Sequence, residues 1–130
     1  MEQKQMILCD TDVIIEFYRN NPKIVRELKR IGQKHLSVCV ITYAEMIFGA
    51  FNKRDQTQIK KDLSSLNIVM IDFPVCVTFM KLMDKYSLSH KIAIPDALIA
   101  ATAIENNLEL FTLNTKDFKY ISDLSLYTIK

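Results

Sequence analysis

Glycine is scarce in this sequence. The chain of 130 residues has two glycines, Gly32 and Gly49, and they lie far apart. Dinucleotide-binding fingerprints and P-loops place several glycines within one short loop, so both are excluded. If this protein binds phosphate groups, it does not hold them in a glycine-rich cradle.

Cysteine and histidine are also few. The three cysteines, Cys9, Cys39 and Cys76, are odd in number and widely spaced, and so are His35 and His90. None of them has the close spacing of a zinc site or a redox motif. Apolar neighbours indicate that the cysteines are buried in a reducing compartment. We expect His35 to open a strand and His90 to lie in a loop.

Long apolar runs and a strong net charge are both missing. No apolar run reaches the ~18 residues of a membrane span, and the run at 6–9 is too short for a signal peptide. Lys and Arg number 17 against 15 Asp and Glu, so the net charge of +2 does not by itself indicate a nucleic-acid binder. Nearly half of the residues are apolar (49%), enough for a packed core. We therefore expect a single soluble, cytoplasmic domain over residues 1–130, with no membrane association.

Short apolar runs alternate with helical patterns along the chain. The runs predict buried strands at 6–9, 36–40, 67–71 and 108–113, with a fifth candidate strand at 126–129. The predicted helices are 11–18, a helix from Pro22 to Gly32, 41–51, 55–66, helices starting at Pro74 and Pro95, and a helical turn at 115–118. Strands without polar alternation, separated by helices, are typical of a parallel sheet covered on both faces. The sequence predicts an α/β domain with a central parallel sheet of four to five strands and helices on both faces.

Four acidic residues lie close behind the predicted strands. Asp10 comes directly after the first strand, and Glu45 lies one turn into the helix after the second. Asp96 is in the first turn of an alanine-rich helix, and Asp117 follows the fourth strand. Ligands of such sheets bind beyond the carboxyl ends of the strands. We therefore expect the four acids to meet at one edge of the sheet.

Each acid also has an ordinary structural explanation. Asp10 can cap a helix, Asp96 can interact with a helix N-terminus, and Asp117 can be a turn residue. Glu45 is hardest to explain in this way, because a mid-helix acid with apolar neighbours needs a partner. Gathered together, the carboxylates repel one another unless a cation is bound. Oxygen ligands without His or Cys favour Mg²⁺ or Mn²⁺ over Zn²⁺.

Four segments of the chain carry a resemblance to a known family. They are Met6-Ile-Leu-Cys-Asp10-Thr-Asp12-Val-Ile-Ile15, Thr42-Tyr-Ala-Glu45, Pro95-Asp96-Ala-Leu-Ile-Ala-Ala-Thr-Ala103 and Thr112-Leu-Asn114-Thr-Lys-Asp117-Phe118. These segments resemble the four motifs of PIN-domain nucleases. Their order and the chain length are most similar to the single-domain VapC-type toxins of bacterial toxin–antitoxin pairs. The resemblance spans residues 6–118, and its third motif is the most specific.

The resemblance implies a PIN-like fold and a metal-dependent endoribonuclease. Asp10 and Asp96 would be the main Mg²⁺ ligands. Glu45 would complete the site or orient the attacking water, and Asp117 would be the outer fourth acid.

Three further motif residues would support the site. Thr112 and Asn114 occupy positions that can hydrogen-bond it. Asp12 stands where the family commonly has Asn. It either adds a negative charge near the metal or simply occupies the first turn of the helix, and we favour the second interpretation.

The resemblance also implies partners. The substrate would be RNA, with tRNA among the candidates, and a cognate antitoxin would bind the toxin as part of a homodimer or a toxin–antitoxin hetero-oligomer. Large apolar residues on the early helices can form a groove for an amphipathic partner helix. Lys53 and Arg54, just beyond the helix with Glu45, are the best candidates for phosphate contacts. Without the four acids, the rest of the chain holds 17 basic and 11 acidic residues, a net charge of +6 around an acidic pocket.

Other interpretations of the same residues exist. The Asp10-Thr-Asp12 segment is also similar to the opening of haloacid-dehalogenase-like phosphatases, with Asp10 as nucleophile and Asp12 as acid or base. This reading explains Asp12 but not Glu45, and it needs a later Lys and a further acidic pair that the sequence does not place. A receiver domain needs a Lys just after its last strand, where this chain offers only Lys130. A non-catalytic RNA- or antitoxin-binding module is a third alternative, which the presence of all four acids disfavours.

Overall fold

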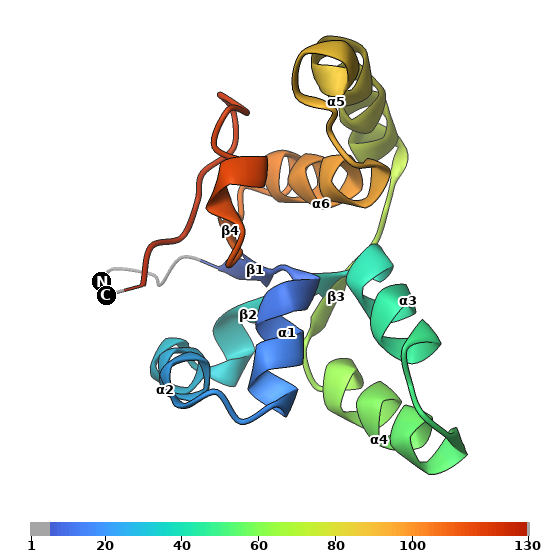
Figure 1. Ribbon diagram of the computed structural model, residues 1–130, viewed down its shortest axis with the longest axis vertical. Coiled ribbons are helices and arrows are strands. Elements are labelled where there is room, and N and C mark those ends of the chain that lie inside the picture. The colour runs from blue at the N-terminus through green and yellow to red at the C-terminus, as the bar shows by residue number, and fades with distance from the viewer. Residues whose placement is uncertain (1–5, 130) are drawn as a thin grey trace.

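The computed structural model describes residues 6–129. Strands alternate with helices along most of the chain (Figure 1). The strands are β1 (Ile7–Cys9), β2 (Leu36–Cys39), β3 (Asn67–Val69) and β4 (Glu109–Phe111). The α-helices are α1 (Thr11–Tyr18), α2 (Pro22–Ile31), α3 (Val40–Phe48), α4 (Lys53–Ser64), α5 (Phe73–His90) and α6 (Ile94–Glu105), with short 3₁₀ helices η1 (Gln33–His35) and η2 (Thr115–Asp117).

The four strands form one parallel sheet in the order β3-β2-β1-β4. β1 is central, and its three residues are buried, as are the four of β2. Burial on both faces explains why these strands are continuous apolar runs rather than alternating ones. Since all four run in the same direction, the segments that follow them emerge at one edge of the sheet.

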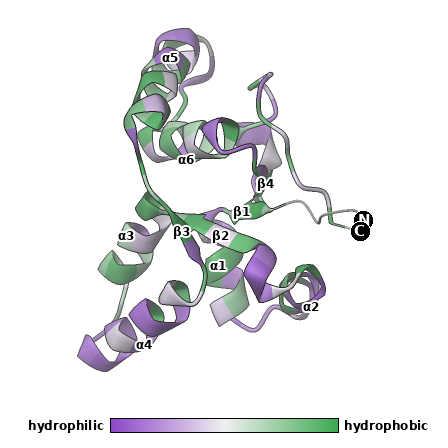
Figure 2. Cartoon of the chain, turned by 180° about the vertical axis from the view of Figure 1, so that it is seen from behind, coloured by the Kyte–Doolittle hydropathy of each residue, from purple (hydrophilic) through white to green (hydrophobic). Residues whose placement is uncertain are grey.

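Helices cover both faces of this sheet, α5 and α6 on one face and α1, α2 and α4 on the other (Figure 1). α6 is rich in alanine, and Ala97, Ala100, Ala101 and Ala103 have no exposed surface. Their small side chains allow the helix to lie close against the sheet. α4 is largely polar along its length (Figure 2), and its buried side chains are those of Ile59 and Leu63.

Polar caps begin several of the helices. The side chains of Asn21, Asn52 and Asp72 accept hydrogen bonds from the first turns of α2, α4 and α5. Each cap satisfies a backbone N–H that has no partner within its helix. Gly32 ends α2 with φ +93°, a conformation that L side chains rarely adopt. Asn21 and Gly32 explain why both ends of α2 were readable from the sequence.

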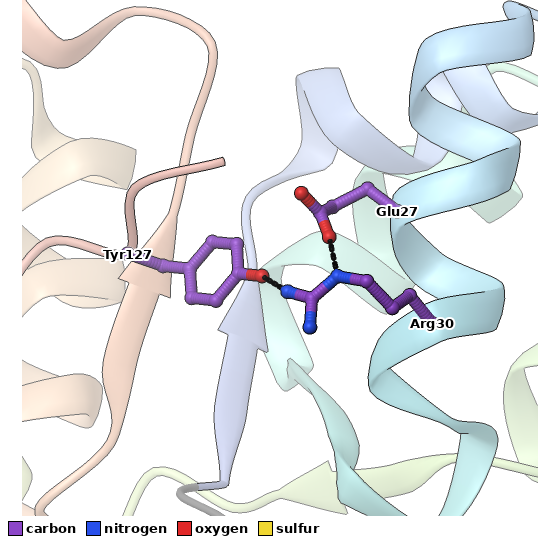
Figure 3. Close-up of polar contacts among 3 residues, drawn as sticks. All are labelled: Glu27, Arg30 and Tyr127. Atoms are coloured by element: carbon purple, nitrogen blue, oxygen red, sulfur yellow. Dashed lines mark hydrogen bonds and ion pairs between the residues drawn. The ribbon is translucent and has the colours of Figure 1, made fainter. Parts of the chain in front are cut away.

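The C-terminal segment is hydrogen-bonded to β4 and contacts α2. Leu110 donates its N–H to the Ser125 carbonyl and accepts from the Tyr127 N–H, both at 2.8 Å. Arg30 lies between the Tyr127 hydroxyl and the Glu27 carboxylate, with 2.5 Å to each (Figure 3). This guanidinium neutralises a carboxylate that is only 4% exposed.

The structure corrects several expectations. The fifth candidate strand at 126–129 is an isolated bridge between Leu110 and Leu126. The helix expected at 41–51 ends at Phe48, and α4 begins at Lys53, two residues earlier than predicted, because Asn52 caps it. His90 is the last residue of α5 rather than part of a loop.

The burial predicted for the three cysteines fails at one of them. Cys76 is exposed, whereas Cys9 and Cys39 are buried as predicted. Met80 on α5 is also exposed, at 62%, because the buried positions of that helix are Val75, Leu82 and Tyr86. No helix between residues 6 and 129 is both long and apolar enough to cross a membrane.

Candidate active site

Asp10 lies at the carboxyl end of the central strand and is 7% exposed. Both of its carboxylate oxygens are held: Oδ1 accepts from the Thr11 N–H and Oδ2 from the Thr112 hydroxyl, each at 2.8 Å. Burial raises the pKa of Asp10, and the carboxylates of Glu45 and Asp117 raise it further, against the lowering effect of the two hydrogen bonds. The chain therefore fixes a buried carboxylate in one orientation.

Asp96, in the first turn of α6, faces the same region. Its pKa is raised to about 6, by burial and then by the carboxylates of Asp10, Asp117, Glu45 and Asp12. The structure thus brings the four predicted acids into one electrostatic neighbourhood, together with Asp12. We call these five residues the acidic cluster.

Asp12 does more than occupy the first turn of α1. Its Oδ2 accepts from the Leu113 N–H at 3.1 Å and lies 3.4 Å from the Thr112 hydroxyl. Burial and the Asp10 carboxylate raise its pKa to about 6. Its Oδ1 is buried and has no hydrogen-bond partner. Asp12 does stand in the first turn of α1, as expected, and it also adds a carboxylate beside Asp10.

Glu45 is exposed, although its neighbours in the sequence are apolar. The hydroxyl of Thr11 lies 2.8 Å from Glu45 Oε1 and 3.1 Å from the Thr42 hydroxyl. The Glu45 carboxylate therefore has a hydrogen-bond partner, Thr11, as a mid-helix acid with apolar neighbours was expected to need, but it is exposed to solvent. Thr11 and Thr42 were not identified as site residues, although each lies in a quoted motif and is a hydroxyl residue just after a strand.

Asp117 belongs to η2 and is held by Asn114, whose side-chain amide donates to Asp117 Oδ2. The Asn114 backbone N–H in turn donates to the Thr112 hydroxyl at 3.1 Å. Thr112 therefore connects Asp10 with the turn that carries Asp117. Both supporting residues named from the fourth motif make hydrogen bonds to acids of the cluster.

No basic side chain of residues 6–129 forms an ion pair with the acidic cluster. Elsewhere the chain neutralises its buried carboxylate, Glu27, with Arg30. Five carboxylates without a counterion, one of them with a buried oxygen that lacks any partner, are suited to a cation. All the available ligands are oxygens, which is the donor set of Mg²⁺, Mn²⁺ or Ca²⁺.

The side chains of the acidic cluster do not form a complete metal coordination site. Across residues 6–129, no three His, Cys, Asp or Glu residues are arranged so that they could hold a metal ion by themselves. This geometry excludes a structural zinc site, but it agrees with Mg²⁺, which keeps several waters and takes one or two carboxylates plus substrate phosphate. The residues present therefore fit an open Mg²⁺-type site rather than a preformed one.

The structure does not bring Lys53 and Arg54 to the acidic cluster. Both are exposed at the beginning of α4 and make no side-chain hydrogen bond or ion pair with the cluster in the described chain. The connection between α3 and α4 lies at an outer edge of the molecule, away from α6 (Figure 1). A contact between these two residues and RNA stays a prediction.

An apolar hollow lies away from the acidic cluster and contains none of its five residues. It is a largely apolar groove of about 460 Å³ between α1, α2 and α4. Its walls include Phe17, Tyr18, Leu28 and Leu66, with Lys29 and Asp62 among its polar residues. Phe17 and Tyr18 are 39% and 37% exposed, which is high for large aromatic residues of a small domain. Part of the apolar stripe on the early helices is therefore a surface groove, as the sequence suggested.

Comparison with known proteins gives consistent matches. The family model for the PIN domain matches residues 7–124. The chain is 32% identical to Ribonuclease VapC1 of Haemophilus influenzae over 126 residues, covering 90% of this chain and 92% of that protein. The chain is also 30% identical to Ribonuclease VapC1 of Rickettsia felis over 131 residues, with 95% and 96% covered.

A solved structure, a toxin–antitoxin complex from Klebsiella pneumoniae, contains a similar chain. Its TM-score is 0.80 at 29% identity, and 95% of this chain and 98% of that chain are covered.

Proposed function

This chain belongs to the PIN domain family, and on that premise we propose that it is a metal-dependent endoribonuclease that acts as the toxin of a type II toxin–antitoxin pair. Relatives with about 30% identity over nearly the whole chain are named ribonucleases. A solved neighbour of nearly the same length is part of a toxin–antitoxin complex. We place its activity in the cytoplasm, where RNA and a reducing environment for Cys9 and Cys39 are both found.

The observation that carries this proposal is the acidic cluster, which has no counterion among residues 6–129. The four predicted acids come from four separate segments: Asp10 follows β1, Asp96 is in the first turn of α6, Glu45 lies within α3 and Asp117 ends η2. Carboxylates gathered in this way destabilise the fold unless a cation binds. Such a cluster is explained if the protein is a ribonuclease whose carboxylates bind a divalent cation together with substrate phosphate.

We assign Mg²⁺, with Mn²⁺ as the alternative, to this cluster. Asp10 and Asp96 are the main ligands: two hydrogen bonds fix the Asp10 carboxylate at the end of the central strand, and the other four acids of the cluster all act on Asp96. Asp117 and Asp12 contribute charge from the periphery. A divalent cation bound there would neutralise charge on the phosphate and make water nucleophilic at neutral pH.

The chain's own residues position the reaction. Thr11 holds the Glu45 carboxylate at the solvent-exposed side of the cluster, where it can accept a proton from the attacking water. The water oxygen then attacks phosphorus in line, the P–O bond to the leaving ribose oxygen breaks, and that oxygen takes up a proton from solvent. Thr112 and the Thr11 N–H hold Asp10 still, so little reorganisation is needed during the reaction.

The partner that regulates this activity is an antitoxin with an amphipathic helix, and we assign its binding to the groove between α1, α2 and α4. An apolar groove with charged residues among its walls fits a helix that has an apolar face and polar flanks. Toxin–antitoxin hetero-oligomers or homodimers of the toxin follow from the same proposal.

The decisive experiment incubates the purified chain with total RNA and with tRNA, in Mg²⁺ and in EDTA, and maps the cut ends. We expect cleavage only with the metal. RNA binding without cleavage would instead support the non-catalytic module. Formation of a covalent aspartyl-phosphate, trapped by a fluorophosphate analogue, would support the phosphatase reading.

A further inference from the structure

Three aromatic rings pack together beside the acidic cluster, where α5 ends. The imidazole of His90 lies on the Tyr120 ring, with centroids 4.0 Å apart and planes 14° apart. Tyr86 meets both rings edge-on, at 5.5 Å from His90 and 4.9 Å from Tyr120. Ser89 Oγ lies 2.7 Å from His90 Nδ1. His90 is nevertheless exposed, so its ring is held in one orientation while remaining open to solvent.

Tyr120 and His90 lie near the acidic cluster because each is close in sequence to one of its acids. Tyr120 follows Asp117 by three residues, and His90 stands just before the loop that leads to Asp96. Burial raises the pKa of Tyr120, and the carboxylates of Asp96 and Asp117 raise it further, so the Tyr120 ring lies within the electrostatic reach of the cluster. A ligand bound to the cluster can therefore extend onto these rings.

A lysine adjoins the rings in an unusual backbone conformation. Lys91 caps α5 with φ +53°, in the left-handed region. The other non-glycine residues with positive φ in the described chain are Asn20 and Asn107, and asparagine tolerates this region well. Glycine is the usual residue at this kind of cap. Keeping Lys91 there places an exposed positive charge beside His90, at some cost to the stability of the backbone.

We propose that His90 is a stacking platform for one unpaired nucleobase of the RNA substrate and that Lys91 contacts the adjoining phosphate. The proposal rests on the ribonuclease function proposed above and specifies a single-stranded segment next to the cut bond. Bases within a duplex are already stacked and paired, whereas unpaired bases stack readily on aromatic side chains. The rings beneath His90 hold it in advance, so little side-chain entropy is lost on binding.

The test uses the full chain and a short single-stranded RNA that carries the fluorescent base 2-aminopurine. Binding is measured in EDTA, so that the RNA is not cut, and stacking quenches the fluorescence. We expect His90→Ala to weaken binding about ten-fold and to lose the quenching, since stacking contributes about 1–3 kcal/mol per base. His90→Phe keeps a ring and should restore both. In cleavage assays with metal, the loss from His90→Ala should fall on KM rather than on kcat.

Lys91→Gly gives a second, independent measurement. Glycine suits the left-handed cap, so the thermal unfolding midpoint should stay the same or rise while RNA affinity falls. Asn20→Gly is the matched control, because it places glycine at a similar φ, +59°, at the end of α1. The control should leave RNA affinity unchanged.

The outcomes separate this proposal from the proposed function. If His90→Ala lowers the unfolding midpoint but the folded variant binds and quenches like the wild type, the stack is only structural and the proposal is overturned. If His90→Ala does not fold, Lys91→Gly decides, and undiminished affinity in that variant overturns the phosphate contact. A wild-type chain that cuts RNA without quenching overturns the platform alone. One that neither binds nor cuts RNA overturns both proposals.

Discussion

The Thr112 hydroxyl donates a hydrogen bond of 2.8 Å to Asp10 Oδ2, although 102 positions separate the two residues in the sequence. The sheet register explains this meeting. Cys9 of β1 pairs with Phe111 of β4 in parallel, so the residues that follow these two strands leave the sheet side by side. The contact between the first and fourth motifs is therefore a direct consequence of strand pairing.

Removing the Thr112 hydroxyl should weaken catalysis without removing a metal ligand. Thr112→Val leaves Asp10 Oδ2 and the Asn114 N–H without their partner. We expect activity at limiting Mg²⁺ to fall about 10- to 100-fold, as for other groups that orient metal ligands. A higher Mg²⁺ concentration for half-maximal cleavage would distinguish this positioning role from a structural one. Thr112→Ser keeps the hydroxyl and should recover most of the activity, and no recovery would contradict the assignment.

Neutralising either main ligand should abolish cleavage. Asp10→Asn and Asp96→Asn each remove a negative charge from the proposed metal site while preserving side-chain size. We expect Mg²⁺-dependent RNA cleavage to fall at least about 100-fold. The matched control is Asp84→Asn, which neutralises an exposed acid of α5 and should cleave like the wild type. Wild-type rates in either ligand variant would show that the site is wrongly assigned.

The acidic cluster should make the metal-free protein less stable at neutral pH than at mildly acidic pH. The pKa of Asp96 is raised from 3.8 to about 6 by burial and by its acidic neighbours. Between these two values the folded state binds more protons than the unfolded state, so its contribution to stability falls as pH rises. Asp96→Asn removes this effect. In EDTA, urea unfolding should therefore show the variant gaining stability over the wild type at pH ~7.5 and losing that advantage near pH ~4.

Mg²⁺ provides the complementary measurement of the same repulsion. Binding to the folded state alone raises its stability, so Mg²⁺ should raise the unfolding midpoint of the wild type more than that of Asp96→Asn. Equal shifts in the two proteins would mean that Asp96 does not take part in binding the metal.

The groove between α1, α2 and α4 should control inhibition rather than catalysis. Phe17→Glu places a charge in the apolar groove at a residue that is already 39% exposed, so the fold should survive. We expect the cognate antitoxin to inhibit RNA cleavage at least about ten-fold less effectively, while cleavage without antitoxin stays the same. Phe48→Glu is the matched control, because Phe48 is 93% exposed and lies outside the groove. Equal inhibition of both variants would place the antitoxin elsewhere.

Local signals allowed much of the fold and site to be predicted. Asn21, Pro22 and Gly32 bound α2 through capping and backbone preferences that act within a few residues. Asp10 and Asp96 stood out because each adjoins a strand end or a helix start. Predicting that the acids gather required one further step, namely that parallel strands present their carboxyl ends together.

Other features depend on contacts that no local pattern contains. The role of Asp12 depends on Leu113, 101 positions away, because that backbone N–H fixes its carboxylate beside Asp10. Glu45 is exposed and is held by Thr11, a residue on another helix, so its apolar neighbours in the sequence do not indicate its surroundings. The stacking of His90 on Tyr120 joins two distant segments, so no local pattern predicts it.

The sequence by itself determined the order of strands and helices, the parallel sheet and the four acids, because periodicity, caps and strand ends are properties of neighbouring residues. Only the tertiary structure decided how those acids are held and charged. Burial and the field of four neighbouring carboxylates raise the pKa of Asp96, and the register between β1 and β4 brings Thr112 to Asp10. Such effects arise between residues far apart in the chain, and they exist only once the sheet has formed.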